Sequence, residues 1–467
     1  MILCKTLLKK GVSVIVMEEK KSLTEAIGRG KKKMMKQYWK RILSVICLLL
    51  ILFAGFIYFC VPIQMGGNRP QSMKSLPLDM VLSKEEVEED RMQAIQFVED
   101  VHPYFVLEKE QSAYEEARQK YIDATLTEMS VGDFQAATAE YLCFFADGHT
   151  KVWWEEEEYI LLEQVYQDGK TYLTEDDKVT DIWVTEIGGV DIETIYETMA
   201  RVFPAENDMA VVINRNKYIT GRNILTLAGA EIVEDSVMVT YSDGSTKDYK
   251  FVQAPYNNGE WKSNSWYMDG DIFVVDFNEC VDDDNLKSIA SELQSAISQG
   301  CDKIIIDVRG NGGGDSNACE RLLEAMGMES PQYGMFIRYS SEAKVQAGYL
   351  RKSGTFRCHA SKKSKTNEAV NLVVLSDRYT FSSATMLCVF VRDGNLGTLI
   401  GEPSSNMPSN YGDILYLPLQ NSHLFACVSH KQFIRPDEDN KERMLVPDIQ
   451  TSAEEAYDKA VTYLHEK

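Results

Sequence analysis

The sequence has few of the residues on which metal and redox enzymes depend. It holds six histidines and no His-Glu-x-x-His pair, so the zinc-protease arrangement of two histidines on one helical face is excluded. Its ten cysteines are scattered and form no Cys-x-x-Cys pair, whereas a secreted domain built on disulfides uses closely spaced cysteines. We therefore expect neither a zinc centre nor a disulfide framework.

Positive charge is scarce beyond residue 41. The net charge of the chain is −22, yet residues 1–41 hold 12 Lys and Arg against 3 Asp and Glu. In the rest of the chain, 37 Lys and Arg are outnumbered by 68 Asp and Glu. An acidic body repels a phosphate backbone, so we do not expect nucleic acid as a partner. Ordinary solubility is the simplest explanation of the acidity.

A long uncharged segment occupies residues 43–62, directly after the basic stretch at 29–41. At about 1.5 Å per residue, a helix of this length spans the roughly 30 Å hydrocarbon core of a membrane. The positive-inside rule places the basic flank in the cytoplasm and the remainder of the chain outside. The alternative is a cleaved signal peptide, but its apolar region would be shorter. The sequence thus predicts a single-pass anchor at 42–62 in the cell membrane.

The chain after the anchor begins with helical patterns. Ser83 is followed by Glu86 three residues later, which is the spacing of a capping box. Apolar residues then recur at helical spacing, and further helices are expected at 109–128 and 131–146. This part is predicted to be a small helical domain.

Beyond residue 152 the pattern changes twice. Short β-rich runs separated by turns come first, with one helix expected at 192–202. From residue 271, strands alternate with helices, and the continuous apolar runs at 303–308 and 371–376 are typical of strands covered on both faces. This alternation predicts an α/β fold class. The expected divisions are a basic cytoplasmic tail at 1–41, the anchor at 42–62, a linker at 63–82, a helical domain at 83–151, a β-rich module at 152–264 and an α/β domain at 265–467.

A glycine-rich turn follows the apolar run at 303–308, within the sequence IIIDVRGNGGGD. Glycines let the backbone turn sharply and present N–H groups that can hold a phosphate or an oxyanion. The dinucleotide spacing Gly-x-Gly-x-x-Gly fails because Asp315 stands at the third glycine position, and no P-loop lysine follows. An oxyanion hole and a purely structural turn remain as the two interpretations.

A serine pair follows the apolar run at 371–376, within the sequence LSDRYTFSSATML. Ser382 and Ser383 are expected to open a helix, and the positive end of a helix favours developing negative charge. That placement suits a nucleophile. The alternative interpretation is that Ser382 or Thr380 only caps the helix.

A serine nucleophile needs a base whose pKa is near neutrality, and histidine is the usual choice. His149 lies in the sequence FFADGHTKVW, where the Asp-Gly turn exposes it. By contrast, His102 lies within a helical pattern and His465 is among the last three residues. A lone histidine after a helix is more often structural, so the assignment of His149 depends on its combination with the serine.

Together these segments resemble peptidase family S41, which includes the C-terminal processing proteases and their tricorn-like relatives. IIIDVRGNGGG is similar to the strand-plus-glycine motif of the family, and TFSSATML resembles its nucleophile segment, which places the nucleophile at Ser382. GTLIGEPSS at 397–405 and LVPDIQ at 445–450 are similar to its Ile-Gly-Glu and Pro-Asp-Ile segments. The leader ending in DGHT matches the histidine-using branch, and the resemblance covers roughly residues 83–465.

The chain departs from the family at the lysine of the Ser–Lys dyad, because Met407 stands 25 residues after Ser382. The histidine-using branch therefore fits better. The resemblance then implies that an acidic residue before the final Pro-Asp orients His149, for which we expect Glu442 or, failing that, Asp437. It also places a PDZ-like domain in the β-rich module, although no Gly-Leu-Gly-Phe type of carboxylate loop is present.

The resemblance implies a crotonase-like α/β catalytic domain at 265–467 and a serine peptidase that acts on extracytoplasmic peptides or protein tails. Ser382 would attack the peptide carbonyl with His149 as base, and the backbone N–H groups of Gly313 and Ser383 would hold the oxyanion. Neither a cofactor nor a metal is implied. The missing lysine keeps one alternative open, a catalytically inactive S41-like protein that binds peptides.

Overall fold

The structure is a computed structural model that describes residues 31–253, except 33, 37, 54, 60, 73 and 177, and residues 262–467. It divides into two units, Met1–Ile63 and Gln64–Lys467. The first unit contains a helix at Met34–Phe59, in which an 18-residue stretch has a mean hydropathy of 2.9. Within the described residues this helix alone is long and apolar enough to cross a membrane. A signal sequence near the N-terminus would pass the same test of length and composition. Most of the tail predicted at 1–41 lies outside the described residues.

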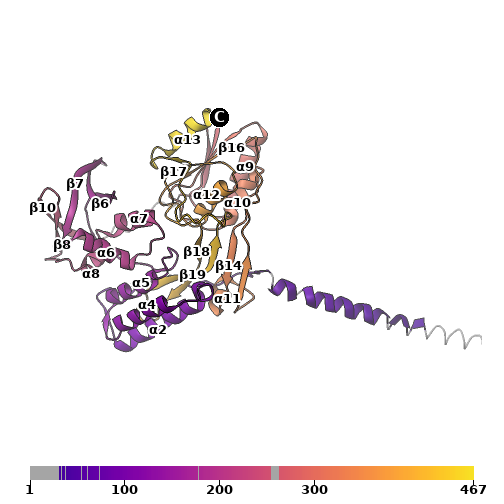
Figure 1. Cartoon of the computed structure of the whole chain (residues 1–467), viewed down its shortest axis with the longest axis horizontal. Helices are drawn as coiled ribbons and strands as arrows, with labels where there is room; N and C mark the ends of the chain where they lie inside the picture. The colour runs from indigo at the N-terminus through magenta and orange to yellow at the C-terminus, as the bar shows by residue number, and fades with distance from the viewer. Residues whose placement is uncertain are drawn as a thin grey trace, which may run out of the picture. The chain divides into compact units, whose positions relative to one another are not determined.

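A six-stranded sheet forms the centre of the α/β part of the second unit (Figure 1). The strand order is β11-β12-β13-β16-β17-β20, in which β11 is antiparallel to β12 and the other neighbours are parallel. This confirms the α/β class. The strands are β11 (Ser265–Asp269), β12 (Ile272–Asp276), β13 (Lys303–Asp307), β16 (Asn371–Ser376), β17 (Thr398–Gly401) and β20 (Ile449–Gln450).

Helices cover both faces of this sheet. Because successive side chains of a strand point to opposite faces, Ile304 and Ile306 join one hydrophobic cluster and Ile305 joins another. The first cluster includes residues of three helices and the second includes residues of α13. The apolar runs predicted as strands covered on both faces are therefore confirmed. The helices are α9 (Asp284–Ser298), α10 (Ser316–Ala325), α12 (Ser383–Asp393) and α13 (Ala456–His465).

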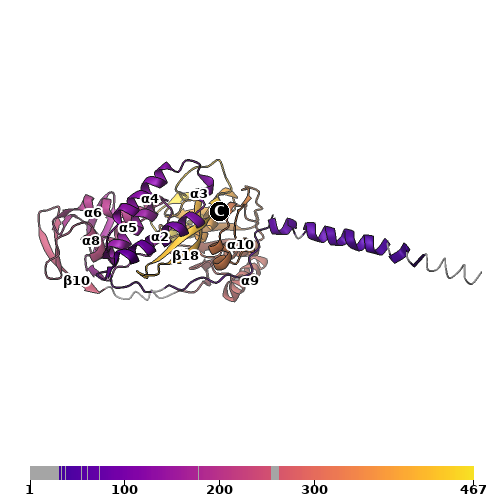
Figure 2. The same ribbon diagram turned by 90° about the horizontal axis from the view of Figure 1, so that it is seen from below.

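An antiparallel sheet in the order β15-β14-β19-β18 extends from this layer toward the N-terminal helices (Figure 1). Figure 2 shows α2, α4 and α5 gathered on one side of the unit. Ser83 and Glu86 form the predicted capping box at the start of α2. The elements are α2 (Lys84–Val101), α4 (Ser112–Ala124), α5 (Val131–Cys143), β3 (Lys151–Val152), β14 (Gly334–Arg338), β15 (Thr355–Cys358), β18 (Asn410–Pro418) and β19 (Phe425–Ile434), with β3 paired to β19.

The middle of the chain forms a seven-stranded antiparallel sheet that includes β5 (Gln164–Gln167), β7 (Lys178–Ile187) and β9 (Ser236–Tyr241), with three helices beside it. The predicted helix is confirmed as α6, Ile192–Val202. The helices α7 (Asp208–Tyr218) and α8 (Arg222–Leu227) were not predicted. No residue of α7 is fully buried, so its sequence lacks the apolar stripe that marks a packed helix.

One buried hydrophobic cluster runs through the helical segment, the middle module and the antiparallel sheet. It includes Phe134 of α5, Ile195 of α6 and Leu415 of β18. These three parts therefore share a continuous core, which fixes the middle module against the rest of the unit. The divisions expected at 151 and 264 stay predictions.

Candidate active site

Ser382 lies on a strained turn between β16 and α12. Its backbone angles are φ 51° and ψ −123°, and a positive φ is costly for a residue with a Cβ. Such strain is commonly held at functional sites, and in α/β-hydrolases a sharp strand-to-helix turn exposes a serine hydroxyl. The turn is therefore built to present Ser382.

The capping interpretation of this segment does not hold. Ser382 occupies the N-cap position of α12, but its side chain makes no capping hydrogen bond. The Thr380 hydroxyl donates to Val308 O at 3.0 Å and not to the helix. The Ser382 hydroxyl is thus left for another role, at the end of a helix whose partial positive charge favours an oxyanion.

The glycine turn packs directly against Ser382. A Cβ built on Gly313 would lie 2.6 Å from Ser382 Cβ and 2.8 Å from Ser383 N. Gly313 also has a φ of 97°, a conformation that only glycine adopts without strain. The Ser383 hydroxyl donates to Gly314 O at 2.7 Å. The turn that carries Ser382 approaches so closely that position 313 requires a glycine.

One polar side chain and one backbone hydrogen bond hold the glycine turn and the turn of Ser382 together. Asp377 accepts N–H groups from both turns, from Gly310 at 3.0 Å and from Thr380 at 2.9 Å. Phe381 donates its N–H to the backbone oxygen of Asn311 at 2.9 Å. The relative position of the two turns is thus fixed before any substrate binds.

The Gly313 N–H does not point to the role expected from the sequence. This group was expected in an oxyanion hole, but it donates to Asn311 Oδ1 at 2.8 Å, because the Asn311 side chain folds back into its own turn. The Ser383 N–H has no acceptor among the described residues. Of the two expected oxyanion donors, Ser383 is therefore the one that is free in this conformation.

His149 is brought to the serine turn although 233 residues separate it from Ser382. Its ring packs on the ring of Phe381, with the two centroids 4.7 Å apart. Neither ring nitrogen of His149 has a hydrogen-bond partner among the described residues. The hydrogen bond expected between Ser382 and His149 is thus not formed here. Catalytic hydrogen bonds are often long without substrate.

The other five histidines have different surroundings. His102 and His430 are fully buried, His102 beside Asp147 and His430 beside Tyr349. His465 pairs with Asp271 at the surface. The remaining two, His359 and His423, do not contact the turn that carries Ser382. Only His149 packs against it among the described residues.

Two buried carboxylates lie next to His149. Its Nδ1 is 3.6 Å from Asp147 Oδ1 and 3.9 Å from Glu206 Oε1. The side chains of Asp147 and Glu206 are 0% and 3% exposed. A carboxylate beside the base can orient the imidazole and stabilise the imidazolium that forms during reaction. These three side chains could also hold a metal ion by their spacing, but none of the histidine-using chemistry requires one.

The pKa values of the two carboxylates are shifted in opposite directions. Burial raises the pKa of Asp147, but interactions with His102 and His149 outweigh burial and hold this pKa well below its ordinary value. Burial raises the pKa of Glu206 above its ordinary value, although His149 and the N–H groups of Met407 and Gly148 act in the opposite direction. Asp147 is thus the more acidic group of the pair.

The acidic residues expected from the C-terminal motif lie elsewhere. Glu442 is 62% exposed and pairs with Arg435 at 3.9 Å, and Asp437 pairs with Lys362 at 3.3 Å. Both border a separate cavity of about 360 Å³. The buried ion pair of Arg435 with Asp393 holds this segment to the end of α12, which turns it away from His149. Glu206 gave no sequence signal, because it lies in a loop of the middle module.

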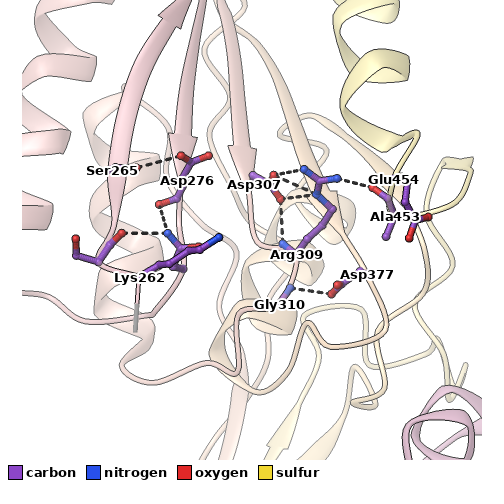
Figure 3. A pocket seen from close by; sticks show the side chains of 11 residues that line it. Lys262, Ser265, Asp276, Asp307, Arg309, Gly310, Asp377, Ala453 and Glu454 are labelled. Carbon is purple, nitrogen blue, oxygen red and sulfur yellow. Dashed lines mark hydrogen bonds and ion pairs between the residues drawn. The ribbon is translucent and has the colours of Figure 1, made fainter. Parts of the chain in front are cut away.

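A second cavity, of about 760 Å³, is lined in part by Arg309 and Gly310 of the glycine turn (Figure 3). Neither Ser382 nor His149 lines it. In Figure 3, Arg309 reaches Asp307, with Nε at 2.9 Å from Oδ1, and Gly310 reaches Asp377. The cavity is therefore bordered by groups that support the glycine turn.

Comparisons with known proteins bear on the family and on the fold. The model of peptidase family S41 matches residues 270–451. The chain is similar to mature CPAF, at 14% identity and a TM-score of 0.53, over 82% of this chain and 96% of that chain. Mature CPAF complexed with lactacystin gives 14% identity and a TM-score of 0.51, over 82% and 98%. No curated protein matches the sequence.

At this identity the solved structures establish likeness of fold, whereas the family match bears on the chain itself. The matched residues 270–451 contain both the glycine turn with Gly313 and the strained turn with Ser382. We conclude that residues 270–451 form a domain of peptidase family S41 and that the chain is a serine-type peptidase.

Proposed function

We propose that the chain is a membrane-anchored, extracytoplasmic serine peptidase that hydrolyses peptide bonds through an acyl-enzyme on Ser382. The observation that carries this proposal is the conformation of Ser382. A non-glycine residue is held at positive φ at the start of α12, and its hydroxyl makes no capping bond. Backbone strain of this kind persists only where the surrounding structure enforces it.

The proposed reaction follows the general acyl-transfer scheme. His149 accepts the proton of the Ser382 hydroxyl while Oγ attacks the peptide carbonyl carbon, and the Ser383 N–H stabilises the oxyanion. His149 then gives the proton to the leaving amine as the C–N bond breaks. Water, deprotonated by His149, hydrolyses the ester and restores Ser382. Substrate binding must close the gap between His149 and Ser382.

We further propose that the α/β part is a crotonase-like domain and that the middle module stands where the family has its PDZ-like domain. The parallel sheet with helices on both faces supports the first proposal. The position of the module between the helical segment and the α/β part supports the second. A binding assay of the full chain with peptides that carry or lack a free C-terminal carboxylate tests the PDZ-like role.

The peptidase activity is testable on the purified full-length chain in detergent. We expect it to cleave members of a mixed peptide library, with new termini detected by mass spectrometry, and we expect the Ser382→Ala chain to leave the same library intact. Equal cleavage by both chains would defeat the proposal.

The second candidate function is a peptide-binding protein without turnover. Two observations favour it. Met407 stands in place of the dyad lysine, and the ring nitrogens of His149 form no hydrogen bond among the described residues. In that case the library would bind to the wild-type chain, but no new termini would appear.

The topology gives a further prediction. The uncharged segment at 43–62 directly follows the basic stretch at 29–41, so the positive-inside rule places residue 467 outside the cytoplasm. An alkaline phosphatase fused after residue 467 is expected to be active, and a fluorescent protein that folds only in the cytoplasm is expected to stay dark there. The reverse pattern would contradict the anchor. Recovery of a shortened, soluble chain would support the signal-peptide alternative.

A further inference from the structure

Glu206 joins the two halves of the candidate active site. It lies in the loop between α6 and α7, far from both halves in sequence. Its Oε1 accepts the N–H of Gly148 at 2.9 Å, next to His149. Its Oε2 accepts the Nδ2 group of Asn406 and the N–H of Met407, both at 2.7 Å.

Asn406 carries this connection on to the nucleophile. Its side chain is fully buried, and its Oδ1 accepts the N–H of Ser382 at 2.9 Å. The backbone of Ser382 is therefore held by the side-chain amide of Asn406, and Glu206 holds that amide in place. One carboxylate thus fixes the loop of the base and the loop that supports the nucleophile.

We propose that Glu206 of the middle module is the positioning residue of the catalytic centre, which sets His149 against Ser382 and balances the charge of the imidazolium. The proposal rests on the function proposed above for Ser382 and His149. Glu206 of the middle module thus takes the role of orienting His149, which was expected for Glu442 or Asp437 of the C-terminal segment.

Asp147 is closer to His149 but is committed to other contacts. Its Oδ2 accepts the hydroxyls of Thr150 and Ser429, both at 2.6 Å, and lies 3.6 Å from the buried His102. Asp147 therefore anchors the His149 loop to α2 and β19. Glu206 alone of the two has a contact on the Ser382 side.

The loop of Glu206 is itself clamped from the C-terminal segment. The Glu206 backbone oxygen accepts from Arg443 Nη2 at 2.7 Å, and Asn207 Nδ2 donates to Ser404 O at 3.0 Å. Arg443 directly follows Glu442. The C-terminal segment thus acts on the active site through a guanidinium that holds the loop, and not through a carboxylate.

The test is Glu206→Gln in the full-length chain. Both carboxylate oxygens of Glu206 accept N–H groups. The amide of a glutamine there must turn its own NH₂ toward one of the two sets of donors, and the hydrogen bonds to that set are lost. We expect kcat to fall about 10²-fold or more, with KM little changed, since misplacement of a catalytic group by 1 Å can cost about that much. Removal of the anion also disfavours the imidazolium, so the acid limb of the kcat/KM profile should move to lower pH. The charged groups facing His149 are Asp147 and Glu206, and Asp147 remains.

Glu156→Gln is the matched control. Glu156 is a partly buried carboxylate that also accepts two backbone N–H groups, from Asn223 at 2.8 Å and Ile224 at 2.9 Å. These contacts lie at the start of α8. We expect Glu156→Gln to lower the melting temperature but to keep kcat and the pH profile of the wild type.

The outcomes separate this inference from the proposed function. Full peptidase activity of the Ser382→Ala variant would defeat the proposed function. Loss of activity in Ser382→Ala together with an unchanged kcat and acid limb in Glu206→Gln would overturn the positioning role alone. If Glu206→Gln does not fold, Arg443→Gln replaces it, because Arg443 is exposed and contacts the loop from outside. We expect that variant to lower kcat several-fold, and an unchanged kcat would overturn the role.

Discussion

Ser382→Ala is expected to lower kcat by several orders of magnitude, about 10³-fold or more, because the acyl-enzyme cannot form without the hydroxyl. The fold should not change, since the Ser382 side chain makes no capping bond. The measurement is the steady-state rate of peptide cleavage, with the melting temperature as the control for folding. Retention of more than a tenth of the rate would contradict the assignment.

His149→Ala is expected to reduce kcat to a similar extent, and the double variant with Ser382→Ala should lose little more than either single variant. Groups that act as a unit give such non-additive losses. Additive losses would show that His149 and Ser382 act independently. The geometry argues against Ser383 as a substitute nucleophile, because its hydroxyl already donates to Gly314 O.

Gly313→Ala is expected to reduce kcat/KM about 10²-fold or more. The new Cβ would meet Ser382 Cβ at 2.6 Å and Phe381 O at 2.8 Å, so the nucleophile turn must shift, and small misplacements of a nucleophile are costly. The positive φ of Gly313 also adds about 1 kcal/mol of strain to any residue with a Cβ. Kinetics and thermal melts on the same preparation separate the two effects, and Gly313→Val should be more severe.

Gly312→Ala is the matched control for this change. It lies in the same turn, but a Cβ there meets no atom within 4 Å, and Gly312 is not among the residues with positive φ. We expect wild-type kinetics and stability from it. Equal loss of activity in both alanine variants would mean that the whole turn is intolerant, and that contact with Ser382 is not the cause.

Local patterns explain why much of the α/β part could be predicted. The strands β13 and β16 are continuous apolar runs because both of their faces are covered, and the capping box at Ser83 is specified by residues three positions apart. Ser382 and Gly313 were identified as candidates for the same reason, since each follows the end of a buried strand. Helix α7 was missed because it buries no residue fully.

Contacts between distant segments explain what could not be predicted. Glu206 and Asn406 are 200 residues apart in sequence, and only the packing of the middle module brings them together. Glu442 was selected from its place before the Pro-Asp motif, but that segment follows the path set by the Arg435–Asp393 ion pair. The N–H of Gly313 was assigned to an oxyanion hole because the sequence gives no sign that the Asn311 side chain folds back onto it.

The most direct test of the account is covalent labelling of the purified full-length chain with a fluorophosphonate, which phosphonylates an activated serine hydroxyl and not an ordinary one. We predict one adduct per chain, located on Ser382 by peptide mass mapping and lost in both Ser382→Ala and His149→Ala. An adduct on another serine, or no adduct on a chain that still cleaves peptides, would contradict the central claim that Ser382 is the nucleophile.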